Sequence, residues 1–399
     1  MQLTLSQLFE SFLDRSKIFR DKSALRSNYI PEELPHRDEQ IEQLASILAP
    51  TIKKETPSNI FIYGKVGTGK TAVTKYVSRE LEAKAIEKGA PLKIIYINCK
   101  MEKITTEYRL LARILKELNE EIPFTGLPTS TVYRKFFEKI DDESKVFIVV
   151  LDEIDSIKQA NDCLYDLTRI NYELKESSVS IIGISNNINF IEGLDPRVRS
   201  SLGEEEIIFP PYNALQLRDI LEQRAEIAFY EDALTPEVIP KCAALAAQEH
   251  GDARKALDLL RVAGEIAERR GDYRVTEKHV DMAEEKLDMD RVIEIVKTQP
   301  KQSKIVLYSI LSLTMLGNNG KEVSTGEVYN LYEEICKRNR VKILTQRRVS
   351  ELISELDMLG IINAKVISKG RYGRTREISL AVSEITAKKL INMLSTFLQ

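Results

Sequence analysis

A glycine-rich segment near the start of the chain constrains the fold most strongly. Gly64–Thr71 reads Gly-Lys-Val-Gly-Thr-Gly-Lys-Thr, follows the apolar run Ile60–Tyr63 and opens the helical pattern Thr71–Lys88. Between a strand and a helix, glycines let backbone N–H groups curl around phosphate, and the helix N-terminus adds positive potential. We expect Lys70 to reach the β- and γ-phosphates of a nucleotide, and Thr71 to ligate Mg²⁺. The predicted nucleotide-binding loop consists of Val66, Gly67, Thr68, Gly69, Lys70 and Thr71.

A second apolar run ends in two carboxylates. Val146–Leu151 is followed directly by Asp152 and Glu153. Charges at the end of a buried strand need partners, and Mg²⁺ supplies one. We expect Asp152 to hold the Mg²⁺ shell and Glu153 to polarise the water that attacks the γ-phosphate. Asn186 follows the next apolar run, Ser180–Ile184, and is a candidate to hydrogen-bond this water or the γ-phosphate; a turn-forming asparagine is the alternative.

The chain around these motifs alternates short apolar runs with helical stretches. Runs that are apolar at every position are typical of strands buried on both faces of a parallel sheet. After Pro210 the strand signals stop, and residues 213–290 are helical patterns rich in Ala, Leu, Glu and Arg. We predict an α/β P-loop core at 1–211, a small all-helical lid at 212–295 and a third domain at 296–399. The predicted core elements are strands at Ile60–Tyr63, Lys93–Asn98, Val146–Leu151, Ser180–Ile184 and Glu206–Phe209, with helices at Thr71–Lys88 and Glu107–Leu118.

Net charge separates the end of the chain from the rest. The 399 residues carry a formal charge of −3, yet Lys297–Gln399 holds 17 Lys and Arg against 9 Asp and Glu, so its charge is +8 and that of the first 296 residues is −11. A gradient of this size is a hint of nucleic-acid contact in the basic part. The composition, 43% hydrophobic and 30% charged, argues against a disordered chain.

Cysteine usage and hydropathy exclude two other classes of protein. Cys99, Cys163, Cys242 and Cys336 lie more than sixty residues apart, so we expect reduced buried thiols and no structural zinc site. The N-terminus lacks the features of a secretion signal, and no run of 18 apolar residues occurs. We therefore expect a cytoplasmic protein with no membrane partner.

The third domain has the pattern of a winged helix. Helical patterns cover Ser303–Leu316, Ser324–Lys337 and Thr345–Leu359, and the short strands Ile361–Ile367 and Thr375–Leu380 form a hairpin after them. Ser324 begins a capping-box pattern that starts the second helix. The third helix carries an apolar stripe that we expect to be buried, formed by Val349, Leu352, Ile353, Leu356 and Leu359.

Positive charge concentrates on the third helix and the tip of this hairpin. Between Lys337 and Arg376 there are 11 Lys and Arg but 3 Asp and Glu, whereas solvated faces usually mix their signs. A recognition helix reads base edges with Arg and Gln, while the wing follows the phosphates. We expect duplex DNA to contact Gln346, Arg347, Arg348, Ser350, Lys369, Arg371, Tyr372 and Arg374.

These motifs together resemble those of the AAA+ ATPases. The glycine-rich loop resembles Walker A, and Gly251–Arg254 opens a helix in the lid. Longer segments are similar to the archaeal replication initiators of the origin-recognition and cell-division-cycle-six family, and the similarity runs from about residue 18 to residue 382. These segments are Leu34–Gln40, Leu194–Leu202, Phe209–Tyr212 and Thr345–Ser350.

The resemblance implies roles for several residues. Asn186 matches sensor 1, and Arg254 matches a sensor 2 that reaches from the lid to the γ-phosphate, with a solvated arginine at a helix start as the alternative. A cation that gains or loses its phosphate partner can bias a hinge. The family's adenine pocket would involve Leu34–Gln40, with Tyr212 and Arg224 at the junction of core and lid. The cofactors implied are ATP or ADP and Mg²⁺.

The chain departs from the AAA+ pattern at one position. Many members end the segment Leu194–Leu202 with Ser-Arg, whose arginine acts on a neighbour's nucleotide, but here the place reads Ser200-Ser201. Arg197 and Arg199 are the candidate substitutes. We therefore expect slow turnover as a nucleotide switch rather than hydrolysis completed by a neighbouring copy.

A long connection between the second and third strands is a further candidate DNA contact. Met101–Phe137 contains Pro123–Pro128 between two helices. In the resembling family an insertion at this place touches DNA. From the residues alone, an apolar turn that packs on its own helices is equally consistent.

The leading hypothesis is an origin-binding replication initiator. It would bind double-stranded origin DNA, associate with the nucleoid, use slow ATP hydrolysis as a switch and help to load the replicative helicase, with other initiator copies or paralogues as possible partners. The alternative is a sequence-specific transcriptional regulator with nucleotide as a structural ligand. A clamp-loader subunit would share the AAA+ motifs but would not need the basic winged helix.

Overall fold

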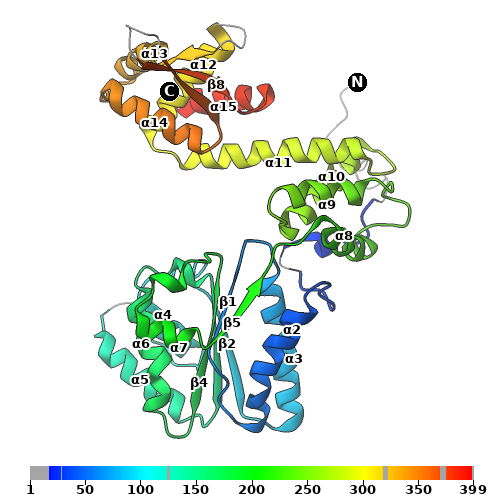
Figure 1. Cartoon of the computed structure of the whole chain (residues 1–399), viewed down its shortest axis with the longest axis vertical. Helices are drawn as coiled ribbons and strands as arrows, with labels where there is room; N and C mark the ends of the chain where they lie inside the picture. Colours follow the sequence, from blue (N-terminus) through cyan, green and yellow to red (C-terminus); the bar gives the residue numbers. More distant parts are fainter. Residues whose placement is uncertain (1–17, 28, 124–125, 318–321, 369–373, 398–399) are drawn as a thin grey trace, which may run out of the picture. The chain divides into compact units, whose positions relative to one another are not determined.

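The chain divides into two compact units, Met1–Val280 and Asp281–Gln399. Figure 1 shows the computed structural model, which describes residues 18–27, 29–123, 126–317, 322–368 and 374–397. Helix α11 (Glu277–Thr298) runs across the boundary between the units. The domain boundaries at 211/212 and 295/296 stay predictions.

The first unit is built on a five-stranded parallel sheet, as predicted. The strand order is β2-β3-β4-β1-β5. Strand β3 lies between two neighbours and is buried at all seven positions, whereas β5 lies at the edge and exposes Glu205, Glu206 and Ile208. The strands are β1 (Ile60–Gly64), β2 (Leu92–Asn98), β3 (Val146–Asp152), β4 (Ser178–Ser185) and β5 (Glu205–Phe209).

Helices cover both faces of this sheet (Figure 1). Alternate residues of β3 enter two separate cores, because successive side chains of a strand point to opposite faces. One core packs Phe147 against α4 (Glu107–Glu117), α5 (Thr129–Asp141), α6 (Ala160–Arg169) and α7 (Pro196–Leu202). The other packs Ile148 against α2 (Asp38–Leu48) and α3 (Lys70–Lys88). The carboxyl ends of the strands are thereby held in a rigid frame.

The segment before the core packs on the lid helices. Phe19 forms a β-bridge with Phe229, and their ring centroids lie 4.7 Å apart. A Cβ atom on Gly264 would lie 2.3 Å from Cζ of Phe19, so this ring needs a glycine beneath it. Residues 18–25 thus pack on the lid, although they precede the parallel sheet in the sequence, whose first strand begins at residue 60. The lid helices are α8 (Ala214–Ala228), α9 (Val238–Gln248) and α10 (Ala253–Arg270).

The second unit has the predicted winged-helix topology. Its sheet is antiparallel with order β6-β8-β7, and the capping box of Ser324 and Glu327 is present. Neither β6 nor the last helix was predicted. The elements are α12 (Lys301–Ser312), β6 (Val323–Ser324), α13 (Thr325–Arg338), α14 (Gln346–Met358), β7 (Ile362–Ser368), β8 (Arg374–Leu380) and α15 (Glu384–Phe397).

One detail of the predicted winged helix was wrong. The first helix extends to Gly317 as predicted, although its last turn, Leu313–Gly317, is π-helical and the α-helical part α12 ends at Ser312. Leu359 was placed in the buried stripe of the third helix, yet 38% of it is exposed, because α14 ends at Met358 and the chain turns at Gly360 with φ 69°. The rest of the stripe is buried as predicted.

The cysteines are buried free thiols, as expected. Burial raises the pKa of Cys99, Cys163 and Cys242, each to about 12, which makes these thiols poor nucleophiles. Within the described residues no group of three or more His, Cys, Asp or Glu is placed to hold a metal ion. The same part of the chain contains no helix long and apolar enough to cross a membrane.

Candidate functional site

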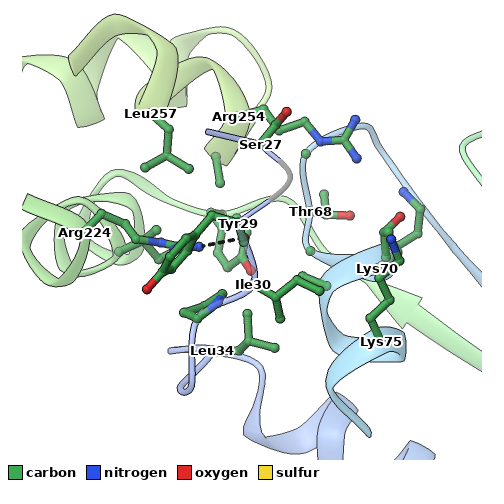
Figure 2. Close-up of a pocket in the computed structure, with 18 of the residues that line it drawn as sticks. Ser27, Tyr29, Ile30, Leu34, Thr68, Lys70, Lys75, Arg224, Arg254 and Leu257 are labelled. Carbon is green, nitrogen blue, oxygen red and sulfur yellow. Dashed lines mark hydrogen bonds between the residues drawn. The ribbon is translucent and has the colours of Figure 1, made fainter. Parts of the chain in front are cut away.

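A pocket that is open to solvent lies where the glycine-rich loop, the ends of β3 and β4 and the lid helices meet. In Figure 2 Arg224 and Leu257, from the lid, lie toward one end and Lys70 toward the other. Val66 is 48% exposed and does not line the pocket. The remaining predicted nucleotide-site residues all line it: Gly67, Thr68, Gly69, Lys70, Thr71, Asp152, Glu153, Asn186, Tyr212, Arg224 and Arg254.

The loop needs glycine at position 67, which contacts Asp252 of the lid, and at position 69, which contacts Tyr212 at the core–lid junction. Gly67 and Gly69 have φ of 72° and 91°, in the left-handed region that favours glycine. A Cβ atom on Gly67 would lie 1.6 Å from Oδ1 of Asp252, and one on Gly69 would lie 2.8 Å from the hydroxyl of Tyr212. The amide of Ala253 donates to the carbonyl of Gly67 at 3.1 Å. The lid therefore touches the phosphate loop directly.

Two cations face this loop. Lys70 is buried at the start of α3, and its Nζ donates to the carbonyl oxygens of Gly64 at 2.8 Å and Lys65 at 2.7 Å. Burial, and after it the nearby charge of Arg254, lowers the pKa of Lys70 to about 8, although Asp152 opposes the shift. Arg254 lies in the first turn of α10, where Asp252 caps the helix. Two positive groups that raise each other's energy favour an anionic ligand between them.

The carboxylate of Asp152 is held from three sides. Thr71 Oγ1 donates to Asp152 Oδ2 at 3.0 Å, and the hydroxyl of Tyr96 donates to the same oxygen. The amide of Glu153 donates to Asp152 Oδ1 at 2.9 Å. Burial and then the charge of Asp152 raise the pKa of Tyr96, so its hydroxyl stays a donor. The Thr71 hydroxyl and the Asp152 carboxylate, with their oxygens 3.0 Å apart, are oxygen ligands of the kind that suits Mg²⁺.

Tyr96 was not foreseen as part of the site. Asn98 of β2 pairs with Asp152 of β3, so Tyr96, two residues earlier, points to the same face of the sheet as Asp152. Lys75 of α3 lies over the Tyr96 ring, 4.5 Å from its centroid. The signal that would have found Tyr96 is the pairing register, which the sequence pattern does not specify.

Asn186 and Glu153 border the pocket from neighbouring strands. Asp152 pairs with Ile184 of β4, so Asn186 lies just beyond the strand end, level with the residues that follow β3. Glu153 has φ 53°, a left-handed conformation that is strained for a residue with a side chain. It lies directly after the end of β3 and lines the pocket. The geometry suits both residues to contact one water molecule or phosphate oxygen.

A buried arginine joins the loop to the core–lid junction. Arg37 is 2% exposed and donates from Nε to the carbonyl of Thr68 at 2.9 Å and from NH2 to that of Pro210 at 2.7 Å. Its guanidinium carbon lies 3.8 Å from the centroid of the Tyr212 ring. Burial lowers the pKa of Arg37, and Tyr212 opposes this effect. Arg37 lies in the predicted adenine segment, but its own role was not foreseen.

The two candidate substitutes for a trans-acting arginine do not line the pocket. Arg197 is held by Asp195, from Nε to Oδ1 at 3.0 Å and from NH2 to Oδ2 at 3.1 Å, and lies over the ring of Tyr165. Arg199 is exposed in the last turn of α7. The action of either one on a neighbouring copy stays a prediction.

The predicted DNA-contacting residues of α14 are exposed at its first turn. Arg347 is 92% exposed, and Gln346 and Arg348 are exposed beside it, while Ser350 is half-buried. Glu351 accepts from Arg348 NH1 at 2.7 Å and lies 3.6 Å from Arg347 Nε. These acidic partners were not predicted. Arg374 begins β8, and Lys369, Arg371 and Tyr372 lie outside the described residues.

The connection between β2 and β3 packs on its own helices where it is described. Ile122 and Leu127 lie against the core beside α4 and α5, and the hydroxyl of Tyr108 donates to the carbonyl of Pro123. Residues 124–125 lie outside the described residues. DNA contact at this place stays a prediction.

Comparison with known proteins identifies the architecture. Three family models match in succession: an AAA domain at residues 53–188, a Cdc6 AAA+ ATPase-type lid domain at 218–285 and a CDC6 C-terminal winged helix domain at 294–389. The ORC1-type DNA replication protein 1 of Methanosarcina acetivorans is 56% identical over 389 residues, which cover 97% of this chain and 94% of the relative. The chain belongs to the ORC1/Cdc6 family of archaeal replication proteins.

Other members of the ORC1/Cdc6 family are similar to this chain over almost its whole length. The ORC1-type DNA replication protein of Pyrococcus horikoshii is 57% identical over 96% of this chain and 92% of its own length. The ORC1 protein of Aeropyrum pernix, solved in complex with DNA, is 48% identical and matches 96% of this chain and all of its own chain with a TM-score of 0.80. The nucleotide-binding core is thus that of a AAA+ ATPase.

Proposed function

We propose that this ORC1/Cdc6 protein is a replication initiator that binds duplex origin DNA and uses bound ATP, with Mg²⁺, to control loading of the replicative helicase. The observation that carries the proposal is one chain with a complete phosphate pocket and a separate helix of exposed arginines. The DNA complex of the Aeropyrum relative supports the DNA-binding part. Further initiator copies would assemble with it at the nucleoid.

Each pocket residue has a chemical role in this proposal. Lys70 and Arg254 would neutralise the β- and γ-phosphates, and Thr71 and Asp152 would hold Mg²⁺, which supplies charge stabilisation at the γ-phosphate. Glu153 would accept a proton from the attacking water, with Asn186 fixing its position. Tyr96 would keep Asp152 in place by its hydroxyl hydrogen bond.

The contact between lid and loop is suited to a nucleotide switch. Arg254 follows directly on Ala253, whose amide bonds the carbonyl of Gly67. Loss of the γ-phosphate would remove a charge-assisted hydrogen bond from Arg254, so the preferred lid angle would change. If hydrolysis is slow because no neighbour supplies an arginine, the rate of hydrolysis would set how long the lid keeps its ATP-bound angle.

The DNA-binding part is tested by separating base reading from phosphate contact. Arg347→Ala should weaken binding to the specific origin duplex about tenfold more than binding to a random duplex, because an arginine on a base edge carries sequence information. Arg371→Ala should weaken both duplexes alike and reduce the salt dependence by about one phosphate contact. Titrations at several salt concentrations, on a duplex found by footprinting, measure both effects. If both variants lost the same affinity on both duplexes, the assignment of base reading to Arg347 and phosphate contact to Arg371 would be refuted.

The acidic partners on α14 give a prediction of the opposite sign. Glu351 forms ion pairs with both Arg347 and Arg348. Glu351→Gln should therefore free Arg347, leave Arg348 with its weaker pair to Glu355 at 3.7 Å, and remove a charge that repels phosphate. We expect affinity for random duplex to rise several-fold and the preference for origin DNA to fall. Glu333→Gln is the matched control, because Glu333 pairs with Lys337 on α13 at 3.1 Å. Unchanged or weaker binding by Glu351→Gln would contradict the interpretation.

A further inference from the structure

One arginine of the basic segment Lys337–Arg376 forms its hydrogen bonds with the protein itself. Arg376 lies in β8, a strand of the wing, and is half-buried. Two residues further along this strand, Ile378 is fully buried in the core of the second unit. Because alternate residues of a strand point to the same face of a sheet, Arg376 points to the face that packs on the helices.

The side chain of Arg376 reaches α14, the predicted recognition helix. Its NH1 donates to the carbonyl of Ser350 at 3.0 Å and to the hydroxyl of Ser354. The Ser354 hydroxyl in turn donates to the same Ser350 carbonyl at 3.1 Å. These bonds join a strand of the wing to the helix, and a charged donor makes them stronger than bonds between neutral groups.

The backbone of Arg376 is held by a second helix. Its amide donates to Oγ1 of Thr325 at 3.3 Å. Thr325 is the first residue of α13 and is 8% exposed, and the capping box of Ser324 and Glu327 fixes the start of this helix. One residue of the wing is therefore bonded both to α13 and to α14.

Arg376 differs in this respect from the arginines at the start of α14. Arg347 and Arg348 are exposed and form ion pairs with Glu351 at the surface, where DNA phosphates can replace the carboxylate. Arg376 instead bonds to uncharged oxygens within the domain. Ser350, which was predicted to contact DNA, is half-buried and gives its carbonyl to Arg376, less than one helical turn after Arg347. A movement of α14 at Ser350 would therefore also move Arg347.

We propose that Arg376 is a positioning residue for DNA reading: it fixes the recognition helix α14 against the wing strand β8, so that one geometry serves both the base contacts and the phosphate contacts. The proposal rests on the proposed DNA binding by this domain. Two contact elements that are held in place bind more tightly, because the second contact needs no further ordering. Base contacts depend most on this geometry, whereas binding to random DNA is mainly electrostatic.

The test compares the full chain with Arg376→Met on the origin duplex found by footprinting and on a random duplex. Anisotropy titrations at several salt concentrations give the affinities and the salt dependence. Arg376→Met should weaken the origin complex about tenfold and the random complex no more than about threefold, with an unchanged salt dependence. Arg376→Lys should restore most of the preference, because both side-chain bonds to α14 come from one nitrogen.

Ser354→Ala provides a second arm from the helix side. It removes one partner of Arg376 with little change of shape, so it should cause part of the same loss of preference. Because both changes break one contact, the double variant should lose less than the sum of the two single losses. Lys388→Met is the matched control: Lys388 is an exposed residue of α15 in the same unit and pairs with Glu384 at 2.6 Å, and its change should leave the preference unaltered.

Three results would overturn the inference while leaving DNA binding intact. The first is an Arg376→Met variant with the preference of the wild type. The second is an equal loss on both duplexes with a salt dependence reduced by about one phosphate contact, which would make Arg376 a direct DNA contact. The third is additive losses for Arg376→Met and Ser354→Ala.

A thermal melt of each variant shows whether it is folded at the temperature of the titrations. Should Arg376→Met fail to fold, Ser354→Ala alone decides, and a wild-type preference in that variant would overturn the inference. A wild type that binds neither duplex, or binds both alike, would instead refute the proposed function.

Discussion

Glu153→Gln should release phosphate from ATP at least about 100-fold more slowly than the wild type, which is the usual scale of a positioned general base. The amide has almost the same shape as the carboxylate but cannot accept a proton from water at neutral pH. Asp152, Thr71 and Lys70 remain unchanged, so affinities for ATP and for duplex DNA should stay within about twofold. Phosphate release with excess and limiting ATP, together with two binding titrations, separates these effects.

Glu205→Gln is the matched control for that experiment. Glu205 is an exposed carboxylate on the edge strand β5 and does not line the pocket, so its neutralisation should leave phosphate release unchanged. Equal rates for Glu153→Gln and the wild type would show that another group activates the water. Rates at background for the wild type itself would refute ATP hydrolysis and leave nucleotide as a structural ligand.

The parallel sheet and the phosphate end of the pocket were predictable because each depends on local sequence. A glycine-rich loop between a strand and a helix restricts the backbone by itself, and Asp152 follows a run that is apolar at every position. The carboxyl ends of parallel strands share one edge of the sheet. The motifs therefore meet there whatever connects them.

Residues whose role depends on strand register or on long-range packing were not predictable. Tyr96 reaches Asp152 only because Asn98 pairs with Asp152 across the strands. Phe19 packs over Gly264, which is 245 positions away in the sequence, so no local pattern links them. Side-chain periodicity reports which face of an element is buried, but it does not name the element that covers that face.

In the winged helix, two features were missed. The basic face of α14 is visible as a cluster of arginines, and the position of Glu351, four residues after Arg347 and three after Arg348, was a signal for their pairing that the prediction did not use. Helix α15 packs into the core with Leu390 and Leu394, after the strands that complete the predicted motif. Helix α15 follows the hairpin, so the winged-helix pattern of three helices and two strands does not include it.

Arg37→Met should lower the free energy of unfolding of the AAA+ core by about 3 kcal/mol and weaken ATP binding at the same time. The arginine donates to the carbonyls of Thr68, Pro210 and His36 from a buried position, so methionine fills the space but leaves these acceptors without their charged donor. Hydrogen bonds to a charged group contribute about 1.5–3 kcal/mol each and are not additive when they share one donor. Loss of the contact with Thr68 would also loosen the phosphate loop, which places Lys70.

Urea unfolding of the full chain, followed by a probe in the core, measures the first effect, and titration with ATP measures the second. Arg79→Met is the control, because Arg79 is exposed on α3 and pairs with Glu80, and its change should stay within about 0.5 kcal/mol. Arg37→Lys keeps the charge but cannot span two carbonyls with a planar fork, so it should recover less than half of the loss. Full recovery by Arg37→Lys would mean that charge alone, and not the forked contact between loop and junction, stabilises this part of the core. A change below about 1 kcal/mol for Arg37→Met would mean that neither the charge nor the forked contact does so.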